Sequence, residues 1–256
     1  MTTNRIPVAA DHGFAPRRVA LTIGALAGAV LIAYANTWSV PFLFDDIVTI
    51  VDNPTIRSAR PWSSVLSPAA HTGVGGRPIA HLSLVCNYAI GGEAVAGYHG
   101  VNLALHLLSG LALFGLVRRT LLRPALAPGL GSHAGAIATA VAALWLLHPV
   151  QTQSVTYLSQ RTEILMALFY LCTLYCFARG AEPPGRPGWL AASVLSCFAG
   201  MASKEVMVTA PVMVLLYDWV FVAGSVRSAW QARWRYYPIA RSEDLAGGAQ
   251  LIENES

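Results

Sequence analysis

Charged residues are scarce in this chain, and their scarcity excludes an ordinary soluble domain. Of its 256 residues, 55% are hydrophobic and only 12% are charged, whereas a soluble domain usually carries about 25% charged residues. The apolar residues form long runs without the alternation of a strand or the stripe of an amphipathic helix. We therefore expect them to insert into a lipid bilayer.

Two further absences narrow the range of functions. The chain has no dense basic patch, because its 17 lysines and arginines are scattered in ones, twos and threes at the ends of apolar runs. Nucleic acid is therefore not an expected partner. The chain also has no CxxC pair, so we draw no redox conclusion and interpret its cysteines as small apolar side chains. They are Cys86, Cys172, Cys176 and Cys197.

Six apolar runs predict an all-α fold, a polytopic membrane helix bundle of about six transmembrane helices. Several runs are short for the roughly 20 residues that a bilayer requires. The first run has a second interpretation as a cleaved signal peptide, because Arg17 and Arg18 precede it and Ala33-Tyr34-Ala35 resembles a cleavage site. The predicted spans lie near 19–38, 98–117, 134–148, 162–178, 189–203 and 206–222.

The distribution of basic residues predicts the orientation, because cytoplasmic loops retain lysine and arginine. A cytoplasmic N-terminus puts twelve basic residues inside and five outside. A further span over 78–92 would reverse this count, but its apolar part, about 13 residues, is too short. We expect it to lie in the membrane interface, with Pro78 in its first turn. The five outer residues are Arg57, Arg60, Arg77, Arg161 and Lys204.

Three segments follow from this topology. Residues 1–18 are expected to form a cytoplasmic tail, residues 19–222 the membrane domain, and residues 223–256 a polar cytoplasmic tail. Within the membrane domain, residues 39–97 form a large first external loop that carries interfacial helices. The candidate site residues are therefore sought on the external side.

Two adjacent carboxylates open the first external loop. Asp45 and Asp46 follow Pro41-Phe42-Leu43-Phe44, directly after a predicted membrane helix. Partial desolvation and mutual repulsion are expected to raise the pKa of at least one of them, which suits a general base. The alternative is that the pair is a solvated loop start or a helix cap.

Three basic residues on the same side are candidate ligands of a phosphate group. Arg77 follows glycines that let the backbone approach a ligand, and Arg161 begins a predicted helix, whose free N–H groups favour an anion. Lys204 lies in the tight turn Ser203-Lys204-Glu205. The alternatives are lipid anchoring for Arg77, a helix-cap salt bridge for Arg161, and mutual neutralisation of Lys204 and Glu205.

Four polar residues fall on one face of the second predicted span. Polar groups at membrane depth face the bundle interior or a cavity, so hydrogen bonds between helices explain them and a transport path is the other interpretation. A zinc site from the two histidines lacks a third ligand at a recognisable spacing. The four residues are His99, Asn102, His106 and Ser109.

A series of short motifs runs in order through residues 34–238 and includes these candidates. The motifs are Tyr34-Ala35-Asn36, Pro41-Phe42-Leu43-Phe44-Asp45-Asp46, Arg77-Pro78, Asn87-Tyr88-Ala89-Ile90-Gly91-Gly92, Tyr98-His99-Gly100-Val101-Asn102-Leu103-Ala104-Leu105-His106, His148-Pro149-Val150-Gln151-Thr152, Gln160-Arg161-Thr162-Glu163, Ser203-Lys204-Glu205-Val206-Met207-Val208-Thr209-Ala210-Pro211 and Leu216-Tyr217-Asp218. Their order and spacing resemble the N-terminal half of the transmembrane and tetratricopeptide-repeat O-mannosyltransferases and their bacterial relatives, within the GT-C class of glycosyltransferases.

The resemblance implies an activity and roles for the candidates. In that family a sugar, usually mannose, passes from a polyprenyl phosphate to a protein hydroxyl on the non-cytoplasmic face, with inversion. Asp45 or Asp46 would orient or deprotonate the acceptor hydroxyl. Arg77, Arg161 or Lys204 would stabilise the departing lipid phosphate. Supporting roles are implied for His99, Asn102, His106, His148, Gln160, Glu163 and Glu205.

The resemblance also implies partners and a location. The expected partners are membrane lipid, a polyprenyl-phosphate sugar donor and a protein acceptor. No cofactor is expected, since this branch resembles metal-independent enzymes, although paired aspartates can hold Mg²⁺ or Mn²⁺. The expected location is the bacterial inner membrane in preference to the endoplasmic reticulum.

The chain departs from the family pattern at two points. Gln153 stands where many relatives have a glutamate, and the further spans and tetratricopeptide repeats of relatives are missing. We therefore expect a truncated product, the N-terminal part of a transferase, with a separate chain as one source of the missing helices. The alternative functions are a transporter or lipid flippase and a non-catalytic membrane scaffold.

Overall fold

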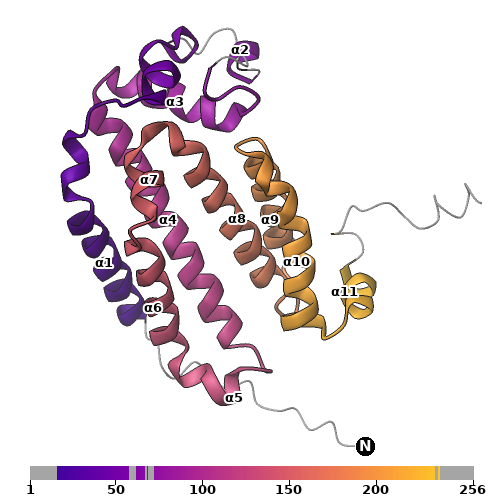
Figure 1. Cartoon of the computed structure of the whole chain (residues 1–256). Coiled ribbons are helices and arrows are strands. Elements are labelled where there is room, and N and C mark those ends of the chain that lie inside the picture. The colour runs from indigo at the N-terminus through magenta and orange to yellow at the C-terminus, as the bar shows by residue number, and fades with distance from the viewer. Residues whose placement is uncertain (1–15, 58–61, 67, 69–71, 234–235, 237–256) are drawn as a thin grey trace, which may run out of the picture. The chain divides into compact units, whose positions relative to one another are not determined.

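The computed structural model describes residues 16–57, 62–66, 68, 72–233 and 236 (Figure 1). These residues form helices and turns and contain no strand, as the predicted all-α class requires. The chain divides into two compact units, Met1–Val214 and Leu215–Ser256, which are described separately below. All of the candidate site residues belong to the first unit.

Each of the six predicted spans is helical. Four stretches of the described residues are long and apolar enough to cross a membrane, namely Val95–Leu121, Ala127–Leu147, Leu158–Gly180 and Glu205–Ala223. They indicate an integral membrane protein. The other two predicted spans are apolar helices of 18 and 15 residues. The helices are α1 (Pro16–Ala33), α4 (Val95–Leu121), α6 (Ala134–Leu147), α8 (Arg161–Gly180), α9 (Pro187–Met201) and α10 (Ala210–Asp218).

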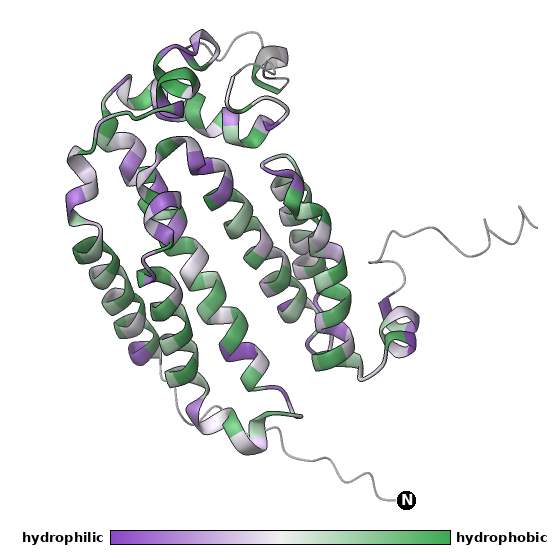
Figure 2. Ribbon diagram, in the orientation of Figure 1, coloured by the Kyte–Doolittle hydropathy of each residue, from purple (hydrophilic) through white to green (hydrophobic). Residues whose placement is uncertain are grey.

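Helix α4 is central in the first unit, where it packs against α6 and α8. Two glycines make this close packing possible, as small residues commonly do between membrane helices. A Cβ atom added at Gly110 would lie 2.5 Å from the Leu146 side chain of α6, and one added at Gly115 would lie 2.7 Å from the Tyr175 ring of α8. Figure 2 shows mainly hydrophobic residues along α1 and α6, and hydrophilic residues near the ends of α4 and α8.

The first loop carries short helices and shares a hydrophobic core with the ends of α4 and α8. Buried Ile50, Ile56 and Val65 pack with Leu84 of α3 and with Leu158, so the loop is fixed to the ends of the membrane helices. Pro78 occupies the first turn of α3, as predicted. These helices lie at one end of the first unit (Figure 1). They are η1 (Ala35–Ser39), η2 (Ile47–Val51), η3 (Pro54–Arg57), α2 (Trp62–Leu66) and α3 (Pro78–Gly91).

Two short connections lie at the same end as the first loop. The connection between α6 and α8 contains α7 (Gln151–Thr156) and η5 (Leu158–Gln160), and the turn after α9 leads into η6 (Glu205–Thr209). The backbone N–H of Ile79 in α3 donates to the carbonyl of Ala202 across 3.1 Å, which joins the first loop to that turn. The connection between α4 and α6 consists of α5 (Ala127–Leu130) and η4 (Gly131–His133).

The second unit contains the end of α10, the helical turn η7 (Trp219–Ala223) and α11 (Val226–Arg233). The fully buried carboxylate of Asp218 accepts two hydrogen bonds from Nη1 of Arg233, at 2.8 and 3.0 Å. Helix α11 therefore occupies the start of the segment predicted as a polar tail. Residues 1–15 and 237–256, which make up most of the two predicted tails, lie outside the described residues.

Candidate functional site

The two adjacent aspartates occupy different environments. Asp46 is only 1% exposed, and its carboxylate accepts hydrogen bonds from the N–H of Leu43 at 3.1 Å and of Ser159 at 2.6 Å. Asp45 is exposed, and its backbone N–H donates to the hydroxyl of Tyr157 at 2.9 Å. The carboxylate of Asp45 therefore faces outward, while that of Asp46 holds the loop in place.

The expected rise in a carboxyl pKa occurs at Asp46. Burial raises the pKa of this carboxyl, because the charged form loses contact with water. The N–H groups of Leu43 and Ser159 act in the opposite direction, since they stabilise the ionised form. Both oxygens are thus engaged with the backbone, which leaves the exposed Asp45 as the carboxylate that a bound molecule can reach.

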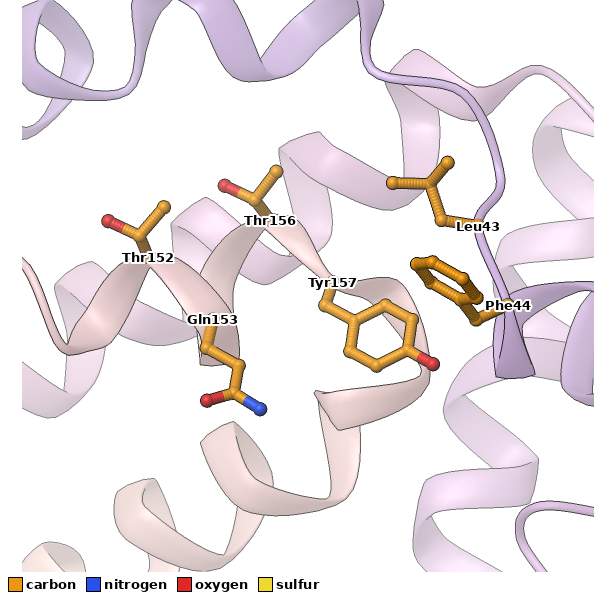
Figure 3. A pocket seen from close by; sticks show the side chains of 6 residues that line it. All are labelled: Leu43, Phe44, Thr152, Gln153, Thr156 and Tyr157. Atoms are coloured by element: carbon orange, nitrogen blue, oxygen red, sulfur yellow. The ribbon is translucent and has the colours of Figure 1, made fainter.

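A pocket of about 290 Å³ lies beside the pair, between the first loop and α7. Phe44, directly before Asp45, forms part of its wall and is 84% exposed. Its backbone has a φ of 45°, which is rare for a residue other than glycine. Figure 3 shows the Phe44 ring beside Tyr157. The pocket is lined by Leu43, Phe44, Thr152, Gln153, Thr156 and Tyr157.

Arg161 is buried inside the protein at the start of α8, only 1% exposed. Its Nε donates to Oδ1 of Asn102 at 2.8 Å, and its Nη1 donates to Oδ1 of Asn87 at 2.9 Å. Its Nη2 donates to the carbonyl of Tyr98 at 2.9 Å. The guanidinium thereby joins α8 to α3 and α4 through neutral acceptors.

Arg77 and Lys204 are each paired with a carboxylate. Nη2 of Arg77 lies 3.3 Å from both carboxylate oxygens of Glu205, and Nζ of Lys204 contacts Oε1 of Glu163. The first pair is the more open, since the Glu205 side chain is 71% exposed and that of Glu163 only 32%. Lys204 and Glu205 thus each have an ion-pair partner outside their turn.

One stretch of chain, residues 157–163, contacts both aspartates and Lys204 and is called the linking segment. Alternate residues of this segment make the contacts. Tyr157 accepts from the amide of Asp45, and Ser159 donates to Asp46. Arg161 bonds to α3 and α4, and Glu163 pairs with Lys204. Four distant parts of the sequence thus meet along a few residues.

The polar face of α4 is buried against neighbouring backbone. Nε2 of His99 donates to the carbonyl of Val40 at 2.9 Å, and Nε2 of His106 donates to the carbonyl of Leu146 at 3.0 Å. The amide of Asn102 donates to the carbonyl of Val155 at 3.1 Å. Among the described residues no group of three His, Cys, Asp or Glu side chains is placed to hold a metal ion. Hydrogen bonding between segments therefore accounts for three residues of this face, whereas Ser109 donates to the carbonyl of Leu105 within α4 at 2.9 Å.

The remaining candidates are peripheral to these contacts. His148 is exposed, and its Nδ1 accepts from the N–H of Val150 at 3.2 Å. Gln160 precedes α8 as its cap residue and is half-buried. Tyr157, Ser159 and Asn87 were not among the predicted site residues, and an asparagine within the mainly apolar run 78–91 was the available signal for Asn87.

Comparison with known proteins identifies relatives of this chain. It is 31% identical over 208 residues to protein O-mannosyl-transferase Tmtc1 of Drosophila melanogaster, a match that covers 77% of this chain and 23% of that protein. It is 32% identical over 201 residues to protein O-mannosyl-transferase Tmtc2 of the same organism, covering 73% of this chain and 20% of that protein. No family model and no solved structure matches the chain.

The similarity extends to vertebrate proteins. Protein O-mannosyl-transferase TMTC4 of Homo sapiens is 28% identical over 216 residues, covering 74% of this chain and 27% of that protein. The chain thus spans about a quarter of the length of the curated relatives that it matches. The chain therefore belongs to the TMTC-like family of transmembrane and tetratricopeptide-repeat proteins.

Proposed function

We propose that this chain is a membrane glycosyltransferase, or part of one, that transfers a sugar from a polyprenyl phosphate to a protein hydroxyl. Its named relatives are protein O-mannosyl-transferases, so mannose is the sugar that we propose. The observation that carries the proposal is the linking segment, which contacts both aspartates near one end and Lys204 at the other. The proposed base and a proposed phosphate-binding cation are thereby joined to the two ends of one short segment.

The exposed carboxylate of Asp45 is the proposed general base. The acceptor hydroxyl attacks the anomeric carbon, Asp45 takes the hydroxyl proton, and the bond to the phosphate oxygen breaks with its electron pair leaving on the lipid phosphate. This direct displacement inverts the anomeric carbon. Asp46 is a positioning residue, because its buried carboxylate holds the amides of Leu43 and Ser159.

Arg77 and Lys204 are the proposed ligands of the departing phosphate. A phosphate that arrives beside them competes with the carboxylates of Glu205 and Glu163, and Arg77 is the easier cation to release because Glu205 is largely exposed. Arg161 is a positioning residue, since its guanidinium is buried and donates to Asn87 and Asn102. Glu163 orients Lys204.

The distribution of basic residues supports an orientation with the N-terminus in the cytoplasm. The first loop, α7 and the turn before η6 then lie on the non-cytoplasmic face, where a polyprenyl-phosphate donor and a secreted acceptor meet. The bacterial inner membrane is the proposed location. The polar face of α4, which motivated the transporter interpretation, makes hydrogen bonds to Val40, Val155 and Leu146.

Transfer of labelled sugar tests the proposal. Membranes that contain the chain are incubated with a radiolabelled polyprenyl-phosphate mannose and a threonine-containing peptide, and label in the peptide is measured. Label is expected with the natural chain and not with the double variant Asp45→Asn, Asp46→Asn. Equal label with both chains would show that the proposed base is wrong.

A further inference from the structure

The pocket beside Asp45 differs from the rest of the site because its walls are almost entirely apolar. Leu43 and Phe44 form one side, and Tyr157 with the α7 residues Thr152 and Thr156 forms the other (Figure 3). None of the steps proposed above uses these walls. An apolar pocket next to a reactive carboxylate is suited to binding a ligand and orienting it.

The backbone around the pocket is held in an unfavourable conformation. Phe44 has a positive φ, and hydrogen bonds on both sides fix it there. The carboxylate of Asp46 binds the N–H of Leu43, and the hydroxyl of Tyr157 binds the N–H of Asp45. The result is an aromatic ring that remains 84% exposed. A strained backbone that exposes an apolar side chain beside a proposed base indicates a functional role for that side chain.

We propose that this pocket binds an apolar side chain of the acceptor polypeptide, one that flanks the hydroxyl to be glycosylated. The inference rests on the proposed function and adds a specificity subsite to it. Leu43, Phe44 and Tyr157 would contact the flanking side chain. The carboxylate of Asp45, which directly follows Phe44, would reach the hydroxyl.

The position of the pocket along the linking segment favours the acceptor over the donor lipid. From Tyr157 to Glu163 the chain advances about 10 Å, given the usual rise of about 2.0 Å per residue in a 3₁₀ helix and 1.5 Å in an α-helix. In a direct displacement the acceptor oxygen and the departing phosphate lie on opposite sides of the anomeric carbon. The phosphate belongs at the Lys204 end, and its lipid chain extends further in that direction. The pocket lies at the Tyr157 end, on the acceptor side.

The size of the pocket also fits one side chain. A cavity of about 290 Å³ admits a leucine or phenylalanine side chain and is small for a long isoprenoid chain. One methylene group in an apolar pocket is worth about 10-fold or more in discrimination. A peptide with phenylalanine beside its threonine is therefore expected to bind at least about 10-fold more tightly than the same peptide with alanine there.

Photocrosslinking of the full chain in detergent tests this inference without depending on sugar transfer. The probe is an alanine-and-glycine peptide with one threonine, followed by a photoreactive phenylalanine analogue. Crosslinks are expected at residues 43–44 and 152–157, mapped by mass spectrometry. An unlabelled peptide with phenylalanine beside the threonine is expected to compete at least about 10-fold better than the alanine peptide.

Three variants make the test specific. Thr152→Trp fills the pocket from the exposed face of α7, and Phe44→Gly removes a wall at a position whose positive φ suits glycine. Both are expected to reduce crosslinking about 10-fold or more. Val150→Trp is the matched control, because Val150 is exposed and does not line the pocket, and it is expected to leave crosslinking unchanged.

The outcomes separate this inference from the proposed function. Crosslinking that maps elsewhere, or that persists in both pocket variants, overturns the inference. Competition by polyprenyl phosphate but not by the phenylalanine peptide also overturns it and assigns the pocket to the lipid. Specific crosslinking without any sugar transfer contradicts the proposed activity and leaves a peptide-binding pocket.

Discussion

The amide of Ser159 donates a hydrogen bond of 2.6 Å to Oδ1 of Asp46, although the two residues are 113 positions apart. Together with the bond from the Asp45 amide to Tyr157, it fixes the first loop to the linking segment, whose last residues begin α8. The exposed carboxylate is thereby set relative to Lys204, which contacts the same helix through Glu163.

The two aspartates are expected to respond differently to the same substitution. Asp45→Asn removes the proposed base and is expected to lower sugar transfer by about 10²- to 10⁴-fold, with little change in the thermal unfolding temperature in detergent. Asp46→Asn keeps Asp45, but an amide offers its single oxygen to only one of the N–H groups of Leu43 and Ser159. We expect a smaller loss of transfer. A larger loss for Asp46→Asn would reverse the two roles.

The buried Asp46 carboxyl is expected to make stability depend on pH. Its pKa is raised in the folded chain, so its contribution to stability is complete below the unfolded pKa of about 3.9 and is lost as the pH rises through the folded pKa. The free energy of unfolding of the natural chain should therefore fall relative to that of Asp46→Asn over this range. Thermal unfolding of both chains from pH 3.5 upward gives the comparison, and an opposite slope would contradict it.

Arg161→Lys is expected to destabilise the chain by about 2 to 3 kcal/mol, because buried acceptors lose their donors. The single ammonium of lysine cannot reach Asn87, Asn102 and the Tyr98 carbonyl together. Arg57→Lys is the matched control. The Arg57 side chain is 45% exposed, so its replacement is expected to change stability by no more than about 0.5 kcal/mol. Equal effects of the two substitutions on denaturation would show that the buried guanidinium is unimportant.

The two ion pairs are expected to differ in strength. A double-mutant cycle with Glu163→Gln and Lys204→Gln should give a coupling of about 1 kcal/mol, since the pair is partly shielded from water. The matching cycle with Arg77→Gln and Glu205→Gln should give a weaker coupling that salt reduces further, because Glu205 is largely exposed. A salt-insensitive Arg77–Glu205 coupling that exceeds the first would argue against Arg77 as the cation released to a phosphate.

The sequence was sufficient to predict the long apolar helices of the fold. A bilayer leaves no backbone group unpaired, so each long apolar run had to form a helix. The 14-residue helix α3, Pro78–Gly91, was also expected, because its apolar run was too short to span and Pro78 suits a first turn. These features depend on local composition, which a single sequence provides.

The contacts within the candidate site were less predictable, because they depend on packing between distant segments. Adjacent Asp45 and Asp46 are alike in sequence, and only the docking of residues 157–159 buries one and exposes the other. Arg161 was predicted to begin a helix, as it does. The buried amides of Asn87 and Asn102 that accept its hydrogen bonds come from other helices, so they could not be predicted from its position. Likewise, the turn at Lys204 and Glu205 gave no sign that each residue has a separate partner.

The hydrogen bonds of Arg161 also constrain the order in which the helices fold during synthesis of the chain. Asn87 and Asn102 leave the ribosome 74 and 59 residues before Arg161. Until α8 is made, both amide oxygens lack the guanidinium that they face in the folded chain. We therefore expect α3 and α4 to reach their final positions only after α8, the fourth of the predicted spans, has inserted. The first loop is then translated early but completes its folding late.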